Sequence, residues 1–327
     1  MLGIVQVAGL RFLIVVVEDP QDDLRVTPMN LPKRHHYVPE MLQKNFVDDE
    51  AKLWAFDSRN RTKGVWRGTH ENLFLEGHLY SHVNADGTKD ATLETWFSEL
   101  EGVAATVVQK IIATARRGHY PNLTKTERQI WDFFFYQQWR RVPDLFASLM
   151  TAEQHRDEVE RLLNELEGQG RRLSNQERSD LLNPASLKRM RRNLRVATLK
   201  TGSDNVLHVI GARGLAIGRT DSSKKFFVLG SRPVVKLNPP GITDLSDVRV
   251  EAWLPIASDI IVGVGLYDRD EILVPFNTKQ TRNQNEASSK QSSQIVGRSK
   301  ALVESLAPYV GTKVRFTPVV TVGMVDA

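Results

Sequence analysis

The sequence predicts an α+β fold, because strand-like and helix-like segments occupy different parts of the chain. Short apolar or alternating runs come first, long stretches with helical periodicity follow, and short apolar runs return from about Asn205. This grouping is typical of α+β proteins, whereas doubly wound α/β proteins alternate strand and helix. We therefore expect N-terminal short strands, a central helical bundle with a buried helix, C-terminal antiparallel strands and a final helix.

The N-terminal segment, residues 1–28, differs from the rest of the chain. Its longest apolar run, at 12–17, is far shorter than the roughly 20 residues that span a membrane, and no small-residue cleavage site follows it. Two interpretations are open: an extra strand, or a start-site artefact ahead of a natural start at Met29. We predict an N-terminal extension at 1–28, a single domain at 29–306 and a C-terminal extension at 307–327.

The first strands of the predicted domain form a hairpin. KLWAFD at 52–57 alternates apolar and polar residues, and GVWRG at 64–68 follows a polar linker. The run HLYSHVNADGT at 78–88 indicates a further strand that leads into an Asp-Gly turn.

Helical periodicity begins at about residue 90. Apolar residues recur every three or four positions up to 112, and Arg116, Arg117 and Gly118 mark the end of that helix. The apolar stripe consists of Leu93, Trp96, Phe97, Leu100, Val103, Val107, Ile111 and Ile112.

The next helix is predicted to lie at the centre of the bundle. It opens with a Thr124/Glu127 capping box, and it is apolar on nearly all sides at 130–136. Pro143 should kink or end it. Charged helices follow at 152–166 and 183–200.

The C-terminal third indicates strands. Short apolar or alternating runs bounded by turns lie at 205–212, 225–231, 248–257 and 260–266. The polar segment 277–299 is open to two interpretations, a solvent-facing helix or a loop. A last helix is expected near Ala301.

Composition excludes several classes of site. The chain has no cysteine, which excludes disulfides, thiolate nucleophiles and cysteine-bound zinc, and which fits the reducing cytoplasm where we place the protein. The formal net charge of +5 is a weak bias toward polyanions. No phosphate-binding loop, dinucleotide fingerprint or nucleophile elbow occurs, so nucleotide cofactors and α/β-hydrolase chemistry have no motif support.

Four segments together resemble a known family. HHYVPEMLQKNF at 35–46, ENLFLEGHLY at 71–80, QQWRRVP at 137–143 and GSRPVV at 230–235 occur in this order. The chain resembles the family catalogued as domain of unknown function 4238, from about Arg34 to about Leu306.

This resemblance implies a set of polar site residues but no settled reaction. The set maps to His35, His36, Gln43, Asn45, Asn72, Gln138 and Arg141. The family often has Ser-Asp before the proline of the later motif, whereas this chain has Ser231-Arg232-Pro233.

The adjacent histidines allow two interpretations. Imidazole titrates near neutral pH and binds metals, and HHYVP looks like the first segment of HNH-type nucleases. His36 would then be the base, His35 a metal ligand or orienting group for a divalent cation, and Asn72 a further catalytic residue. His78 and His82 cannot complete such a site on a strand, where they would lie about 13 Å apart. The other interpretation is a structural polar corner, with one imidazole bonded to a carbonyl and Pro39 starting a helix.

Arg141 and Gln138 lie on the predicted buried helix. A buried guanidinium is costly unless it is paired. Arg141 is therefore either paired with Glu94 or Glu101 of the preceding helix, or a clamp that binds a carboxylate or phosphate.

The run KRMRRNLR at 188–195 concentrates cations, among them Arg189 and Arg192. It is either a nucleic-acid contact or the solvated face of an amphipathic helix. We do not expect a membrane partner.

Taken together, the sequence predicts a nuclease-like phosphodiester hydrolase, in which Arg141 clamps phosphate and Gln43, Asn45 and Gln138 line the site. The alternative is a non-catalytic module that senses a ligand or partner through the same polar pocket.

Overall fold

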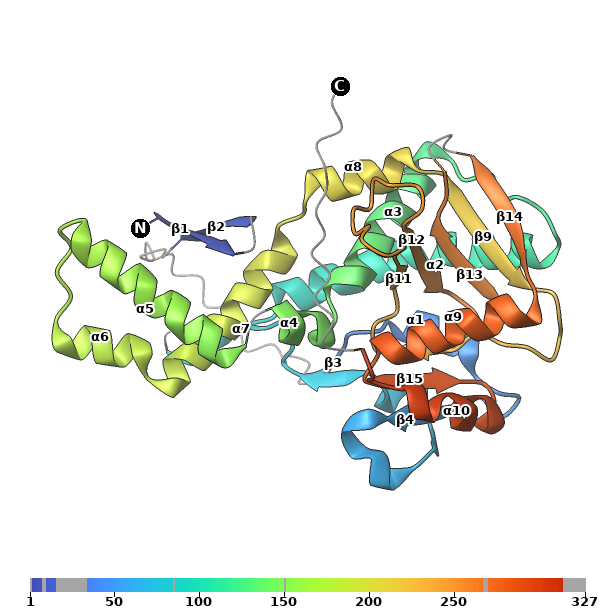
Figure 1. Ribbon diagram of the computed structural model, residues 1–327, viewed down its shortest axis with the longest axis horizontal. Helices are drawn as coiled ribbons and strands as arrows, with labels where there is room; N and C mark the ends of the chain where they lie inside the picture. The colour runs from blue at the N-terminus through green and yellow to red at the C-terminus, as the bar shows by residue number, and fades with distance from the viewer. Residues whose placement is uncertain are drawn as a thin grey trace.

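The computed structural model describes residues 2–7, 10–15, 34–84, 86–149, 151–266 and 270–313. The α+β prediction is confirmed: short strands, a group of helices, a second group of strands and a final helix follow one another along the chain. Figure 1 shows a main body that contains the larger sheets, and a helical arm that extends from it.

The helices fall mostly in the middle of the chain. They are α1 Glu40–Gln43, α2 Thr92–Arg116, α3 Lys125–Arg140, α4 Pro143–Leu149, α5 Ala152–Gly168, α6 Asn175–Leu182, α7 Pro184–Lys200, α8 Asp204–Ala212, α9 Thr278–Gln291 and α10 Lys300–Leu306.

The strands are short. They are β1 Leu2–Val7, β2 Leu10–Val15, β3 Arg34–His36, β4 Leu53–Asp57, β5 Trp66–Gly68, β6 Leu75–Gly77, β7 His82–Val83, β8 Lys89–Asp90, β9 Leu215–Thr220, β10 Leu229–Gly230, β11 Val235–Leu237, β12 Glu251–Pro255, β13 Ile260–Val264, β14 Glu271–Phe276 and β15 Gln294–Gly297.

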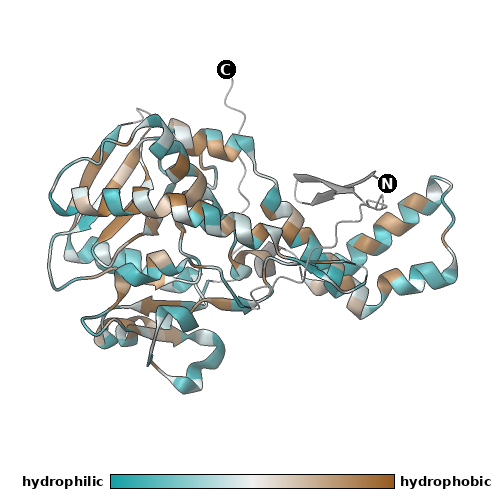
Figure 2. Cartoon of the chain, turned by 180° about the vertical axis from the view of Figure 1, so that it is seen from behind, coloured by the Kyte–Doolittle hydropathy of each residue, from teal (hydrophilic) through white to brown (hydrophobic). Residues whose placement is uncertain are grey.

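The largest sheet has the strand order β11-β12-β13-β9-β14. Its pairs are antiparallel except β14 with β9, which is parallel. Gly218 of β9 allows the ring of Phe276 to approach, because a Cβ at this position would lie 2.5 Å from that ring. Figure 2 shows that hydrophobic residues concentrate on these strands and on the helices against them.

A second sheet joins distant parts of the chain. Its strand order is β10-β15-β4-β5, so β15 from the C-terminal part lies between β10 and the N-terminal strand β4. The register pairs Gln294 with Asp57 and Ile295 with Phe56. The predicted β4–β5 hairpin is confirmed, although its linker is a 3-10 turn at Ser58–Lys63.

The central helix α3 is buried as predicted. Thr124 and Glu127 form the capping box, and Trp131, Phe134 and Phe135 face the core. The helix ends at Arg140, and α4 starts at Pro143. One member of the stripe predicted for α2 was wrong, because Val103 is 52% exposed.

Two C-terminal predictions need correction. The segment 205–212 is helix α8 and not a strand, because Ser203 caps it and Val206, Val209 and Ile210 are buried on one face at helical spacing. The polar segment 277–299 is neither wholly solvent-facing nor a loop. It contains α9, which buries a face of small and amide residues, followed by β15. Strands β9 and β14 were not predicted.

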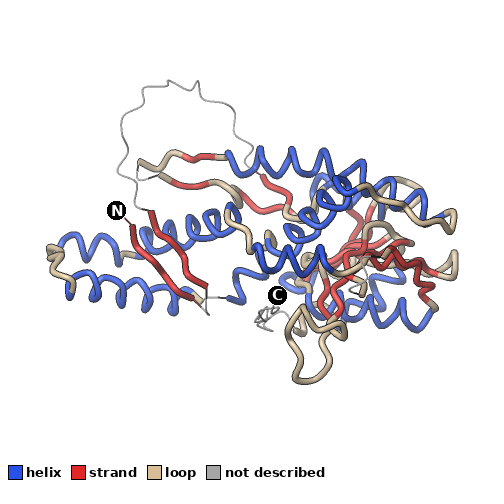
Figure 3. Tube along the Cα trace, turned by 90° about the horizontal axis from the view of Figure 1, so that it is seen from above, coloured by secondary structure: helices blue, strands red, loops and turns tan. Residues whose placement is uncertain are grey.

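The helices α5, α6 and α7 form the arm. In Figure 3 they lie at the opposite end of the molecule from the large sheet. Their contacts are mainly with one another and between α7 and β7. Among the described residues, no helix combines the length and apolar character needed to cross a membrane.

The strands β1 and β2 pair with each other, and neither is hydrogen-bonded to a strand of another sheet. Part of the predicted 12–17 strand, up to Val15, lies in β2; residues 16 and 17 lie outside the described residues. The domain boundaries predicted above stay a prediction.

We expect a chain that starts at Met29 to unfold at the same temperature as the full chain. The reason is that the β1–β2 hairpin is not hydrogen-bonded to any strand of the other described sheets. Thermal unfolding followed by circular dichroism would test this. A clear drop in melting temperature on removing residues 1–28 would show that the hairpin is an integral part of the fold.

Candidate functional site

The histidine pair lies on the short strand β3, which is antiparallel to β6. Successive residues of a strand point to opposite faces, so the two rings enter different surroundings. The His35 side chain is fully buried, whereas the His36 side chain is 20% exposed. Pro39 precedes α1, which makes this segment a tight polar corner.

His35 is held both by its ring face and by a ring nitrogen. Its Nδ1 accepts a hydrogen bond of 3.1 Å from the backbone N–H of Tyr80, and its ring stacks on the Tyr80 ring at 5.8 Å. Nδ1 therefore presents a lone pair. The Oε2 atom of Glu94 lies 3.4 Å from the same nitrogen.

Glu94 fits this arrangement best as a neutral acid. Burial raises the pKa of its carboxyl to about 7, against the opposing effect of Arg141. The Nδ1 lone pair of His35 already accepts from the Tyr80 amide, and Oε2 of Glu94 has no hydrogen-bond donor in the described part of the chain. A buried oxygen without a donor is less costly on a neutral carboxyl than on a carboxylate. Glu94 is thus a buried acid that lies beside the His35 ring.

Glu94 should make stability depend on pH. Because its folded pKa is raised from the ordinary 4.5 to about 7, its contribution is fully present below 4.5 and is lost as the pH rises through 7. The loss is up to about 3 kcal/mol. Glu94→Gln has no charge to bury, so we expect it to be more stable than the wild type at pH 8 and close to it at pH 4.5.

Urea unfolding at both pH values measures this difference. Glu99→Gln, an exposed position on the same helix, is the matched control and should leave it unchanged. A Glu94→Gln protein that gains nothing at pH 8 would contradict the prediction.

Arg141 ties three elements together from a fully buried position. Its Nε donates to the carbonyl of Tyr37 at 3.0 Å, and its Nη2 donates to the carbonyl of His36 at 3.3 Å. Its Nη1 lies 2.7 Å from Oε1 of Glu101 on α2. The predicted pairing with a glutamate of the preceding helix is therefore present, and the clamp for phosphate stays a prediction.

A second polar group, which we call the Glu40 cluster, lies at the surface beside His36. Nδ1 of His36 is 3.5 Å from Oε1 of Glu40, and Nε2 of His70 is 3.6 Å from Oε2 of the same carboxylate. Nζ of Lys44 lies 3.5 Å from that Oε2. The cluster consists of His36, Glu40, Lys44 and His70.

The hydrogen bond of His36 fixes its tautomer. Its Nε2 donates to the carbonyl of His70 at 3.1 Å, so Nδ1 carries the lone pair. Burial lowers the pKa of His36, and the nearby Glu40 carboxylate only partly offsets this. His36 is therefore neutral at pH 7, and its Nδ1 can accept a proton.

Asn72 lies on the same 3-10 turn as His70, at His70–Asn72. Its Nδ2 donates to Oγ1 of Thr69 at 3.1 Å, and its Oδ1 accepts from Arg34 at 3.5 Å. Asn72 therefore lies on the same turn as His70 of the Glu40 cluster. The His35 ring, in contrast, is buried on the other face of β3.

The predicted amide residues differ in how they are satisfied. Asn45 donates to the carbonyl of Ile256 at 2.9 Å and accepts from Gln109, which is a structural role. Gln43 donates to the carbonyl of Val38 at 2.8 Å, but its Oε1 has no hydrogen bond to any described residue. Neither polar atom of the fully buried Gln138 has one in the described part of the chain.

A family profile described as a protein of unknown function (DUF4238) matches residues 34–301. The matched range includes the histidine corner, the central helix and both larger sheets. The chain belongs to the DUF4238 family. The predicted resemblance is confirmed, and the family description gives no activity. Neither the comparison with curated proteins nor that with solved structures finds a match.

The basic helix of this DUF4238 chain, α7, uses part of its charge for structure. Arg192 donates to the carbonyls of Gly77 and His78, and Arg195 donates to the carbonyl of Leu79 at 2.6 Å. These arginines hold the segment after β6, in which His78 has a positive φ of 52°. The binding roles predicted for Arg189 and Arg192 stay predictions.

No group of three or more His, Asp or Glu side chains within the described ranges is arranged to hold a metal ion. The predicted ligand His35 has its Nδ1 occupied by the Tyr80 amide. The divalent cation therefore stays an expectation from the sequence pattern of DUF4238.

Sequence reasoning missed Glu40 and the second histidine, His70, and it named Glu94 only as a partner for Arg141. Glu40 could have been found, because it follows His36 by four residues in HHYVPE. His70 precedes Asn72 by two residues, but no local pattern brings it to His36 across the sheet.

Proposed function

We propose that this protein is a nuclease-like phosphodiester hydrolase whose general base is His36. The observation that supports this is the Glu40 cluster, in which two imidazoles flank one carboxylate at the surface. Positioned imidazoles are the commonest general acids and bases of enzymes.

The hydrolysis can be written with the residues of the cluster. Nδ1 of His36 takes a proton from water, and the water oxygen attacks phosphorus. The P–O bond to the leaving group breaks, and His70 gives a proton to the departing oxygen. The hydrogen bond from Nε2 to the carbonyl of His70 orients the ring, and Glu40, 3.5 Å from Nδ1, stabilises the imidazolium that forms. Lys44 and the neighbouring Arg34 supply positive charge for the phosphate.

In this proposal Arg141 and His35 are positioning residues. Arg141 has no exposed surface and already contacts two carbonyls and Glu101. It fixes the backbone of His36 and does not meet the substrate. His35 anchors the other face of the same strand.

Fluorescent single-stranded RNA and DNA oligonucleotides and bis(p-nitrophenyl) phosphate would test the proposal, each with EDTA and with added Mn²⁺ or Zn²⁺. We expect cleavage of at least one of these diesters. Comparison of the cleavage rates with EDTA and with added metal shows whether a divalent cation takes part. A folded protein that cleaves none of them under any condition would overturn the proposal.

The binding-module alternative has one observation in its favour. The unpaired atoms of Gln43 and Gln138 are buried polar groups that need water or a polar ligand. Native mass spectrometry of the purified protein would detect a retained small ligand. A cytoplasmic location, supported by the absence of cysteine, completes the proposal.

A nucleic-acid substrate would also engage the basic helix. Because Arg192 and Arg195 hold backbone carbonyls, the informative variant replaces Lys188, Arg189 and Arg191 by Gln. We expect weaker oligonucleotide binding and a salt slope reduced by about 1 for each phosphate that the variant no longer neutralises. Fluorescence anisotropy at several salt concentrations measures both. Absence of oligonucleotide binding by the wild-type protein at low salt would contradict a role of α7 in nucleic-acid binding.

A further inference from the structure

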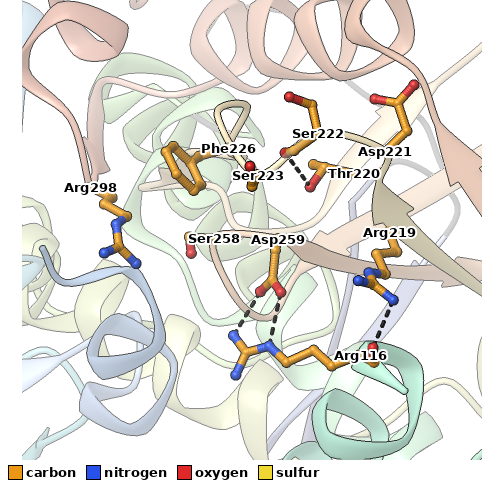
Figure 4. A pocket seen from close by; sticks show the side chains of 10 residues that line it. All are labelled: Arg116, Arg219, Thr220, Asp221, Ser222, Ser223, Phe226, Ser258, Asp259 and Arg298. Carbon is orange, nitrogen blue, oxygen red and sulfur yellow. Dashed lines mark hydrogen bonds and ion pairs between the residues drawn. The ribbon is translucent and has the colours of Figure 1, made fainter. Parts of the chain in front are cut away.

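An open pocket of about 300 Å³ lies between the C-terminal end of α2, the end of β9 and the turn before β13 (Figure 4). It shares no residue with the Glu40 cluster. Its lining residues are Arg116, Arg219, Thr220, Asp221, Ser222, Ser223, Phe226, Ser258, Asp259 and Arg298.

The charges of the pocket are not mutually cancelled. Arg116 binds Asp259 through bonds of 2.8 and 2.7 Å, which neutralises that carboxylate. Figure 4 shows the Asp221 carboxylate pointing away from this pair. Two further guanidinium groups, those of Arg219 and Arg298, remain on opposite sides of the pocket.

Both of these arginines are held in place. Arg219 donates through Nη1 to the carbonyl of Arg116 at 2.7 Å. Arg298 lies over the ring of Phe226 at 5.3 Å, and its carboxylate partner Asp49 is 92% exposed and so only weakly bound. Arg219 is thus oriented before any ligand arrives, and Arg298 has only a weak carboxylate partner that a ligand could replace.

Ser258 lies between them and supplies a hydroxyl donor. It is only 5% exposed, and its backbone N–H and carbonyl are used by Asn45 and Phe227. In the described part of the chain its hydroxyl makes no hydrogen bond, although it lines the pocket. Its oxygen is not fully enclosed, so the hydroxyl is open to the pocket and can donate to a ligand there.

We propose that this pocket binds the phosphate group of a small-molecule ligand, held between Arg298 and Arg219 with the Ser258 hydroxyl as a further donor. Guanidinium groups bind phosphate oxygens in pairs of hydrogen bonds. Figure 4 shows Arg298 and Arg219 on opposite sides of the pocket with Ser258 between them. The oxygens of a phosphate are numerous enough for three donor groups, whereas a carboxylate offers only two. This site goes beyond the proposed hydrolysis at His36.

Isothermal titration of the full chain with inorganic phosphate tests the site, with acetate as the carboxylate probe. We expect phosphate binding that Arg298→Gln weakens by about tenfold or more and Ser258→Ala weakens several-fold. Arg249→Gln, an exposed arginine paired with Asp247 outside the pocket, is the matched control and should bind like the wild type.

The pocket shares no residue with the Glu40 cluster, so this test is separate from the test of catalysis. Circular dichroism checks that each variant is folded; Arg298→Lys, which keeps the charge, should lose less affinity than Arg298→Gln. Absence of phosphate binding by the wild type, equal binding of acetate, or unchanged affinity in folded Arg298→Gln and Ser258→Ala would each overturn the proposal.

Discussion

Replacing His36 by alanine is expected to lower the rate of phosphodiester cleavage by about 10²–10⁴-fold, which is the usual contribution of a general base. The free energy of unfolding should change little, because the half-buried ring makes one hydrogen bond, to the carbonyl of His70. Such a bond contributes on the order of 1 kcal/mol. Cleavage assays and urea unfolding on the same preparation separate the two effects.

The pH dependence of the rate gives a second readout. A base must be deprotonated to act, and burial lowers the pKa of His36 from its ordinary 6.5. On the acid side, the fall of kcat/KM with decreasing pH should therefore be centred below pH 6.5. An acid limb centred above 6.5 would assign the base to another group.

Two variants serve as controls for His36→Ala. His119→Ala removes an exposed histidine beyond the end of α2 and should change nothing. His35→Ala removes a buried ring that accepts from Tyr80 and stacks on it, so it should lose stability as well as function. If His36→Ala unfolds the protein or leaves cleavage intact, the HHYVP motif has a structural role and no catalytic one.

Replacing Arg141 by methionine is expected to cost about 3–5 kcal/mol of stability, the usual result of removing one partner of a buried ion pair. The methionine keeps the apolar stem but leaves the Glu101 carboxylate and the carbonyls of His36 and Tyr37 without their donor. Urea unfolding measures the loss. Adding Glu101→Gln should recover part of it, because the uncompensated charge is then gone.

The matched control is Arg249→Met, which breaks the surface pair with Asp247 and should have little effect. The outcome also distinguishes the roles of Arg141. A stable, folded Arg141→Met protein that has lost substrate affinity would favour the phosphate clamp over the positioning role.

The fold could be predicted where local chemistry decides it. Residues close together in the sequence determine the capping box of α3 and the alternation of apolar and polar residues in β4. Helix α8 was mistaken for a strand because β-branched and apolar residues dominate it, and its buried face is set by packing against α3. Helix α9 buries a polar face that contains Gln284, Asn285 and serines, and Asn285 donates to the carbonyl of Phe226. A buried polar face has no hydrophobic periodicity, so the sequence pattern could not predict it.

The candidate site could be predicted only in part, for a similar reason. Adjacent histidines and a nearby glutamate are visible in one motif. The sequence left two candidate partners for Arg141, Glu94 and Glu101 of the preceding helix, and the structure pairs it with Glu101. The approach of His70 depends on the route of the chain through β4, β5 and the turn after them, which sequence spacing does not contain.

The position of β15 between β10 and β4 has a consequence for synthesis in the cell. The β4–β5 hairpin leaves the ribosome early, but its partner strand follows only after nearly all of the remaining chain. Until then β4 presents an unpaired edge, which is a template for aggregation. Nascent chains halted before Gln294 should therefore bind chaperones and be cut readily by proteases, and completion of β15 should end both.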